Sequence, residues 1–343
     1  MRAGVNRQEV DELVRRVGVT KAGMERKVAA ILFTYRCSIA CRHCLFGCAA
    51  TRPDVVMDAE RCVRYLAQLF ELGRAVHIAG GEPMLYWNVL QEVLTLAAAR
   101  GVSPHFIESN CSFAGDDALV RERFGFLKDH GVMGILLSCD PYHQEFVPPD
   151  CFLRARHIAR DVFGAENVWE SSASDDDVRD FARVVRDEQR LAAHVRAHPP
   201  TFTGTAAHKL APLLDAKPLE EVVCEAAPDG ARKRVTCAKE LSAESIWEVH
   251  IDVYDNIQTN CGLIFGKADR TPIADVMKQL PRVNFVVRML AEEGPLALAE
   301  FARDKHGFAI PTQTRQKCEL CYWTRRCLHA HYSQFVGPAE IYA

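Results

Sequence analysis

Three cysteines at short spacing, Cys37, Cys41 and Cys44, have the clearest chemical potential in this sequence. They directly follow an apolar stretch, residues 28–35, that is typical of a β-strand. In a parallel α/β barrel this position lies on the C-terminal rim, where catalytic residues gather. Three thiolates can hold three irons of a four-iron cluster and leave the fourth iron open to a substrate. The spacing therefore predicts a reactive iron–sulfur centre.

A glycine-rich turn, Gly80-Gly81-Glu82-Pro83, ends the second expected strand. Together with the three cysteines, this turn makes the chain resemble the radical S-adenosylmethionine (radical SAM) superfamily. The resemblance implies that the open iron binds SAM and that an electron from the reduced [4Fe–4S] cluster cleaves SAM to a 5′-deoxyadenosyl radical. It also implies that Gly80 and Gly81 permit close backbone approach and that Glu82 accepts a hydrogen bond from the methionine ammonium. His43 stands where the family has an aromatic residue near the adenine, and an imidazole can stack there.

A closed metal site is the alternative for the first cysteines, because Cys48 follows Cys44 and could supply a fourth ligand. Their three-residue gap is similar to the last gap of a ferredoxin motif. The first gap is longer than in such motifs, however, and Ala49 stands where they have proline. We therefore expect Cys48 to be a buried thiol.

Polar residues end the third, fourth and fifth expected strands. By the same resemblance, residues at these strand ends hold the ribose and carboxylate of SAM: Ser109, Asn110, Ser138 and Asp140, which Glu170 or Ser172 could join. The alternative is that such residues only form turns.

Titratable residues are dense after the fourth strand, where Asp140, Tyr142 and His143 lie close together in the sequence. They are candidates to bind or deprotonate a substrate, and the alternative is a helix start that Asp140 caps. A thiol at the barrel mouth could also return a hydrogen atom to a substrate radical, as in some epimerases of the family. Cys111 is the candidate, because Cys139 alternates with inward-facing residues and should face the helices. A buried structural cysteine is the alternative for Cys111.

A second group of cysteines lies in the C-terminal third: Cys237, Cys261, Cys318, Cys321 and Cys327. It resembles the SPASM or twitch extension that holds auxiliary four-iron clusters in many radical SAM enzymes. Five cysteines fit one such cluster, with Cys261, Cys318 and Cys321 as ligands and either Cys237 or Cys327 as the fourth. A structural zinc site is the alternative. His331 stands where a two-cluster extension has another cysteine, and we expect it to lie on the surface.

The rest of the sequence must provide the elements that position these residues. Short apolar stretches alternate with amphipathic helical ones, which is typical of parallel strands covered by helices. The expected strands span residues 28–35, 75–81, 104–110, 133–140, 166–173 and 194–200, with helices such as 57–73 and 88–101 that each end at a glycine. They predict an α/β fold, a partial (β/α)6 TIM-like barrel followed by a small cysteine-rich α+β domain.

The expected domains are a leading helix (1–27), the barrel (28–204), a connector (205–236) and the SPASM/twitch-like iron–sulfur domain (237–343). Within the last domain, residues 249–261 predict a hairpin in which Asn256 can adopt positive φ at the turn.

Composition excludes several classes of protein. The formal net charge is −3 without a block of like charge, which argues against nucleic-acid and anionic-membrane partners. No apolar run reaches membrane-spanning length, and the N-terminal segment lacks the apolar core of a signal peptide. Fourteen cysteines without an export signal indicate metal ligands and thiols in the reducing cytoplasm.

The expected function is therefore radical chemistry under anaerobic conditions, with a flavodoxin- or ferredoxin-type electron donor. We expect a peptide or protein substrate that is oxidised, cross-linked or epimerised, because a partial barrel leaves room for a bulky molecule. A small metabolite such as a sugar or cyclitol is the alternative, because residues 1–27 are too few for a peptide-recognition domain. A protein of another class, a non-catalytic iron–sulfur carrier or a zinc protein, would have no use for Glu82.

Overall fold

The computed structural model describes residues 3–170, 173–226 and 230–343, and the side chains from residue 7 onward within these ranges. Its centre is an eight-stranded sheet with the order β11-β10-β9-β1-β2-β3-β4-β5. Six neighbouring strands are parallel: β1 (Val28–Leu32), β2 (Ala75–Ala79), β3 (Phe106–Ser109), β4 (Gly134–Leu137), β5 (Val168–Trp169) and β9 (Glu248–Asp252). The predicted α/β class and partial barrel of parallel strands are therefore confirmed.

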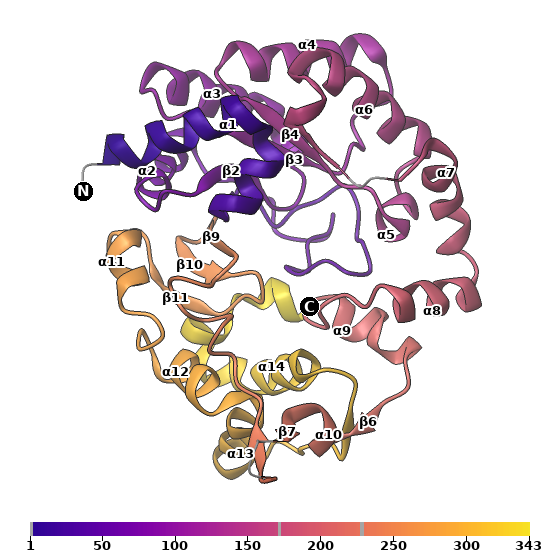
Figure 1. Cartoon of the computed structure of the whole chain (residues 1–343), viewed down its shortest axis with the longest axis vertical. Coiled ribbons are helices and arrows are strands. Elements are labelled where there is room, and N and C mark those ends of the chain that lie inside the picture. The colour runs from indigo at the N-terminus through magenta and orange to yellow at the C-terminus, as the bar shows by residue number, and fades with distance from the viewer. Residues whose placement is uncertain (1–2, 171–172, 227–229) are drawn as a thin grey trace.

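Four helices surround the parallel strands in Figure 1: α2 (Ala59–Phe70), α3 (Trp87–Ala99), α4 (Asp117–Asp129) and α6 (Pro149–Phe163). Their apolar side chains share one buried core with strand residues such as Ile31, Ile78 and Ile107. The start of α2 is fixed by Asp58, whose side chain accepts a hydrogen bond from the backbone N–H of Arg61. The helices thus cover one face of the sheet and leave its other face toward the barrel interior.

Helix α1 (Ala3–Arg26) closes the interior face at the N-terminal ends of the strands (Figure 1). Its residues Val10, Leu13 and Val14 form an apolar cluster with the first residues of three strands: Val28, Ala75 and Phe106. Because side chains alternate along a strand, the residues two positions further on face the same side. The interior therefore has an apolar floor made with α1 and a second layer above it.

The expected strand at residues 194–200 is wrong, because most of this segment belongs to helix α8 (Glu188–Ala197). The buried residues of α8 are Leu191 and Val195, which are four positions apart and so share one face of a helix. Asp187 caps the helix by accepting hydrogen bonds from the next turn. The sixth parallel strand is instead β9, which pairs with β1 at the opposite side of the sheet.

The predicted hairpin is present and extends the barrel sheet. Strand β9 continues through a turn into β10 (Asn256–Thr259), which pairs with β11 (Ile264–Lys267). The residue with positive φ at this turn is Asp255, at 66°, rather than the expected Asn256. Asn256 lies in β10 and donates from its side chain to Asp252 at 2.7 Å. Residues 237–343 therefore contribute strands to the same sheet as the barrel.

The remaining elements are mostly helical. The other helices are α5 (Pro141–Gln144), α7 (Asp175–Val184), α9 (Ala206–Lys209), α10 (Leu219–Val223), α11 (Ile273–Lys278), α12 (Phe285–Glu292), α13 (Gly294–His306) and α14 (Lys317–Val336). The short strands are β6 (Lys217–Pro218), β7 (Cys224–Ala226), β8 (Arg232–Arg234) and β12 (Gln313–Thr314), and the 3₁₀ helices are Pro83–Tyr86, Ala165–Asn167, Ala211–Leu213 and Ala339–Tyr342. None of the described helices is both long and apolar enough to cross a membrane.

Candidate active site

The loop that follows β1 brings the first three cysteines to the wall of a cavity. Cys37, Cys41 and Cys44 line this cavity of about 330 Å³ together with the glycine pair that ends β2. Backbone hydrogen bonds hold the loop, from Cys37 N to Ala49 O and from Cys44 N to Cys41 O, both at 3.2 Å. The two motifs that carried the resemblance therefore meet in space.

The environment of the thiols fits a shared metal cluster. Burial raises the pKa of Cys37 to about 12. Hydrogen bonds with Cys41 and Cys48 hold the pKa of Cys44 well below its usual range, and the bond with Cys41 has the larger effect. The backbone N–H of Cys48 also donates to the Cys44 sulfur at 3.3 Å. Because bound iron offsets the cost of buried thiolates, the first three cysteines fit a [4Fe–4S] cluster, with Cys48 beside Cys44.

The glycine pair packs directly against the cysteine loop. Gly80 and Gly81 both have positive φ, 85° and 48°. A Cβ on Gly81 would lie 2.0 Å from the carbonyl oxygen of Arg36, and a Cβ on Gly80 would lie 2.3 Å from the Leu32 side chain. Only glycine fits at either position, and the close approach of this backbone to SAM stays a prediction.

Glu82 is 1% exposed, and three groups of the protein donate to its carboxylate. The donors are the backbone N–H of Met84 at 3.0 Å, the hydroxyl of Ser109 at 3.0 Å and the backbone N–H of Asn110 at 2.7 Å. Burial raises the pKa of Glu82 to about 7, while these hydrogen bonds oppose the rise. Glu82 thus fastens the end of β2 to the end of β3, and its contact with the SAM ammonium stays a prediction.

The polar residues at the strand ends do lie at the cavity. Ser109, Asn110 and Ser138 all line it. Asn110 also donates from its side chain to the Cys37 sulfur at 3.3 Å and to the hydroxyl of Ser38 at 3.1 Å. Asn110 therefore supports the cysteine loop, and the roles of these residues toward ribose and carboxylate stay predictions.

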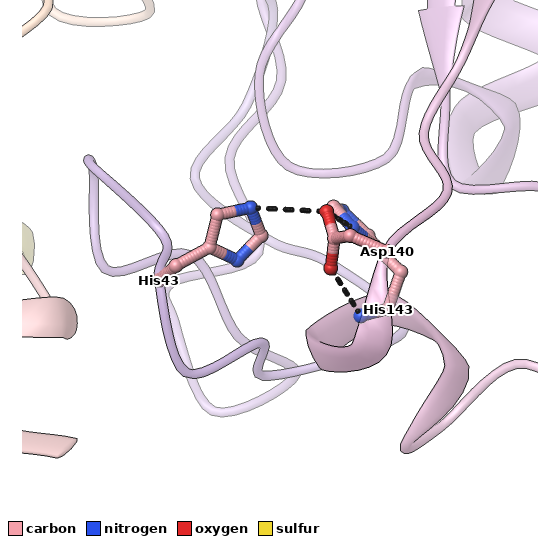
Figure 2. A group of neighbouring side chains, drawn as sticks. All are labelled: His43, Asp140 and His143. Carbon is pink, nitrogen blue, oxygen red and sulfur yellow. Dashed lines mark hydrogen bonds and ion pairs between the residues drawn. The ribbon is translucent and has the colours of Figure 1, made fainter. Parts of the chain in front are cut away.

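His43, Asp140 and His143 form one group beside the cysteine loop, as Figure 2 shows. One Asp140 oxygen lies 2.8 Å from His143 Nδ1 and 3.3 Å from His43 Nε2. The other accepts from the backbone N–H groups of Tyr142 and His143, so Asp140 caps α5 as the alternative predicted. Burial alone would raise the pKa of Asp140, but the imidazoles of His143 and His43 hold it well below its usual range.

This group faces the cavity only in part. His43 and His143 line the cavity, whereas Asp140 and Tyr142 do not. The Tyr142 ring packs against the His43 ring with 4.7 Å between centroids. Stacking of His43 on adenine and proton transfer by Asp140, Tyr142 or His143 stay predictions.

Two other candidates lie away from the cavity. Cys111 is fully buried, and its sulfur contacts the carbonyl oxygen of Ser109 at 3.8 Å, which favours the structural alternative. Glu170 pairs with Arg160 and, at 3.6 Å, with Arg156. Ser172 lies outside the described residues.

The C-terminal cysteines surround a second, larger cavity of about 640 Å³. Four of the five line it: Cys237, Cys261, Cys318 and Cys321. Cys318 and Cys321 lie one turn apart at the start of α14. Cys327 lies further along α14 and is not part of the lining. His331 is exposed and stacks on His306, with 4.1 Å between ring centroids.

A buried cation lies next to the second group. Arg325 is 1% exposed and donates to the hydroxyl of Thr203 at 3.2 Å and to the carbonyl oxygen of Val336 at 3.2 Å. Burial raises the pKa of Cys321, and the guanidinium of Arg325 opposes that rise. A permanent positive charge at this position favours thiolate, the form that binds a metal.

Four ionisable residues that were not predicted from the sequence lie in the barrel interior: His77, Glu108, Glu248 and His250. All except His77 line the smaller cavity. The signal for them was available, because β2 carries His77 within an apolar stretch and β9 alternates Glu248 and His250 with Val249 and Ile251.

Parts of the chain are similar to known proteins. Residues 31–162 match the family model described as the radical SAM superfamily. GTP 3′,8-cyclase of Listeria monocytogenes is 23% identical over 200 residues, which cover 54% of this chain and 58% of the relative. GTP 3′,8-cyclase of Moorella thermoacetica is 25% identical over 205 residues, which cover 52% and 56%. The chain thus spans little more than half the length of these relatives.

Among solved structures, the crystal structure of BtrN in complex with AdoMet and 2-DOIA aligns with a TM-score of 0.42 and 15% identity, covering 79% of this chain and 88% of that one. The segment that matches the family model contains the three cysteines of the first motif and the glycine-rich turn. This segment therefore matches the radical SAM superfamily, whose cofactors are a [4Fe–4S] cluster and SAM.

Proposed function

We propose that this radical SAM enzyme abstracts a hydrogen atom from a carbon of a small polar substrate bound between its two cysteine groups. The observation that carries the proposal is the arrangement of the two cavities. The smaller is lined by the first three cysteines together with Cys48, and the larger by four C-terminal ones. Leu45, Thr201 and Glu248 line both, so the two cavities adjoin. A molecule in the larger cavity would therefore lie next to the SAM site.

Different residues around the smaller cavity have different roles in holding the cofactors. Cys37, Cys41 and Cys44 hold the cluster, and Asn110 donates to the first of these sulfurs. Gly81 keeps the end of β2 against the cysteine loop without a side chain between them. When bound, the cluster and SAM supply a 5′-deoxyadenosyl radical that removes hydrogen from the substrate.

Cys237, Cys261, Cys318 and Cys321 are the proposed ligands of one auxiliary [4Fe–4S] cluster. Four thiols around one cavity complete a site without an open position, which supports this ligand set. The placement of Cys327 outside the cavity supports Cys237 as the fourth ligand. A zinc ion would use the same four thiols, and the metal content of the protein separates the two.

The lining of the larger cavity supports a small polar substrate. Its lining carries charges of both signs, Lys239, Lys317 and Arg325 with Glu240 and Glu248, beside apolar side chains such as Trp247 and Leu263, and Lys317 donates to Glu240 at 2.6 Å. A cavity of this size suits a single small molecule. The similarity to proteins named GTP 3′,8-cyclase, about a quarter identical, points in the same direction. A peptide substrate, which the sequence favours, stays the alternative. The deuterium-transfer experiment below separates the two substrate classes.

The first experiment is to incubate the anaerobically reconstituted protein with dithionite and SAM. Formation of 5′-deoxyadenosine supports the enzyme, and its absence from protein with intact clusters would point to a non-catalytic iron–sulfur carrier. Flavodoxin and ferredoxin, the proposed electron donors, then replace dithionite in turn.

A second experiment separates the substrate classes. Extracts of cells grown in deuterium oxide are divided into a small-molecule fraction and a peptide fraction, and each is added to the reaction. Deuterium that appears in 5′-deoxyadenosine only with the small-molecule fraction supports the proposal. Deuterium transfer only from the peptide fraction would overturn the substrate class while leaving the radical chemistry intact.

A further inference from the structure

Two histidines converge in the layer above the apolar floor of the barrel. His77 on β2 and His250 on β9 both pair in register with Ala30 of β1, which lies between them. Register partners in a parallel sheet point to the same face, so both imidazoles enter the interior on either side of a methyl group. Glu248 lies two residues before His250 and therefore faces the same side. The small side chain of Ala30 leaves the space in which these three meet.

The distances from the two imidazoles to the carboxylate match those between ligands of one ion, and all three ligand atoms lie within 4.8 Å of one another. His77 Nε2 lies 2.8 Å and His250 Nε2 lies 3.1 Å from the same oxygen, Oε1 of Glu248. With metal–ligand bonds of about 2.1 Å, two ligands at a right angle are about 3 Å apart. The group therefore offers two imidazole nitrogens and a carboxylate oxygen at coordination spacing.

A hydrogen-bonded histidine–glutamate network explains this geometry less well. His77 is 2% exposed, and among the described residues neither of its ring nitrogens has a partner in good hydrogen-bond geometry, although Nε2 lies so close to Glu248. At this Nε2–Oε1 distance it is the angle that departs from good hydrogen-bond geometry. Nδ1 of His250, which is 3% exposed, also lacks a partner. Buried polar atoms without partners are costly, and an ion shared by the three side chains would use the His77 nitrogen.

We propose that His77, Glu248 and His250 bind a divalent cation of the Fe²⁺ or Mn²⁺ class. Two imidazoles and one carboxylate form the donor set that such ions favour, and it leaves coordination positions open. Glu248 and His250 line the smaller cavity, and Glu248 also lines the larger one, so the open positions face the junction of the two. An oxygen atom of a bound molecule would complete the coordination.

The surrounding charges agree with a cation at this position. Glu108, on the same face of β3, also lines the cavity. Burial raises its pKa, and the histidines His77 and His250 oppose that rise. A divalent ion would stabilise both carboxylates in their charged form in a place that is otherwise shielded from water.

The test is a titration of the cluster-loaded protein with Mn²⁺, followed by electron paramagnetic resonance of free Mn²⁺. Mn²⁺ prefers oxygen and nitrogen to thiolate, so the cysteines do not interfere. SAM is left out, which makes the result independent of the proposed function. We expect one bound Mn²⁺ per chain and an affinity at least about 100-fold weaker in Glu248→Gln. The midpoint of thermal unfolding should rise with Mn²⁺ in the wild type and not in the variant.

The control variant is His143→Ala, because His43, Asp140 and His143 also offer two imidazoles and a carboxylate. Mn²⁺ binding should survive this change. Loss of binding in His143→Ala with retention in Glu248→Gln would overturn the proposal, as would the absence of bound Mn²⁺ in the wild type. Should Glu248→Gln not fold, pulsed resonance of His143→Ala still decides, because this variant leaves His43 as the one imidazole of the other group: couplings of two ¹⁴N ligands to bound Mn²⁺ support the proposed site, and their absence overturns it.

Discussion

The two cysteine groups are assembled in different ways. The first occupies one loop, residues 37–44, directly after a strand. The second draws Cys237 from the segment before β9, Cys261 from the end of the hairpin, and Cys318 and Cys321 from α14. Its thiols meet only when the hairpin and α14 have packed together. The first group therefore depends on local chain geometry, and the second on tertiary structure.

This difference bears on what each group can do. The first three thiols, with Cys48 and the glycine pair beside them, line the smaller cavity from neighbouring stretches of chain, whereas the four thiols of the larger cavity come from three separate segments. A metal in the second group would also join the hairpin to α14 and so stabilise the fold. We expect loss of the first group to remove the chemistry alone, and loss of the second to affect stability as well.

The largest effect is expected from Cys41→Ala. With two thiolates left, the loop cannot hold the cluster that binds SAM, so formation of 5′-deoxyadenosine should fall to background. The absorption spectrum of the auxiliary cluster should remain, because its four thiols lie around the other cavity. Cys224→Ala serves as the matched control, since Cys224 lies on β7 and lines neither cavity. Loss of both clusters in Cys41→Ala would contradict the independence of the two groups.

The second prediction compares Cys318→Ala with Cys327→Ala, two cysteines of the same helix. Iron content should fall from about eight to about four per chain in the first variant and stay near eight in the second. Cys318→Ala should also lower the midpoint of thermal unfolding, because the hairpin loses its link to α14. Iron loss in Cys327→Ala would show that the ligand set is wrong, and zinc in place of half the iron would identify the metal as structural.

The same contrast explains how much of the molecule the sequence predicts. The cysteines and glycines of the first site are readable because strand, loop and turn are each local, and the structure places them together. The choice between Cys237 and Cys327 is not readable, because it depends on which face of α14 meets the hairpin. The histidines of β2 and β9 were missed for a related reason. Their meeting depends on β9 pairing with β1, a register between residues more than 200 positions apart.

The third prediction concerns Glu82, which joins the ends of β2 and β3 at the first site through hydrogen bonds rather than through a metal. Its folded pKa, about 7, lies above the ordinary value of 4.5, so the folded state favours the protonated form. Its contribution to stability is therefore present in full below pH 4.5 and is lost as the pH rises through about 7. The shift corresponds to about 3 kcal/mol.

Glu82→Gln removes this titration. In protein without SAM, the unfolding midpoint of the wild type should fall relative to that of Glu82→Gln as the pH rises from 5.5 to 8. Thermal unfolding followed by circular dichroism at several pH values measures the difference. A difference that does not vary with pH would mean that Glu82 is ionised throughout this range.

The smallest effect is expected from Cys48→Ala, which decides whether the first site is open or closed. The Cys48 thiol lies beside Cys44, but its backbone N–H, which donates to the Cys44 sulfur, remains in the variant. Iron content and 5′-deoxyadenosine formation should therefore stay close to the wild type, with a loss of stability of about 1 kcal/mol from the shortened core side chain. A cluster with Cys48 as fourth ligand would behave in the opposite way: Cys48→Ala would create the vacant iron, and SAM would perturb the cluster's resonance spectrum only in the variant. If SAM perturbs the cluster's resonance spectrum equally in both proteins, the vacant iron is the one that the first three cysteines leave without a protein ligand.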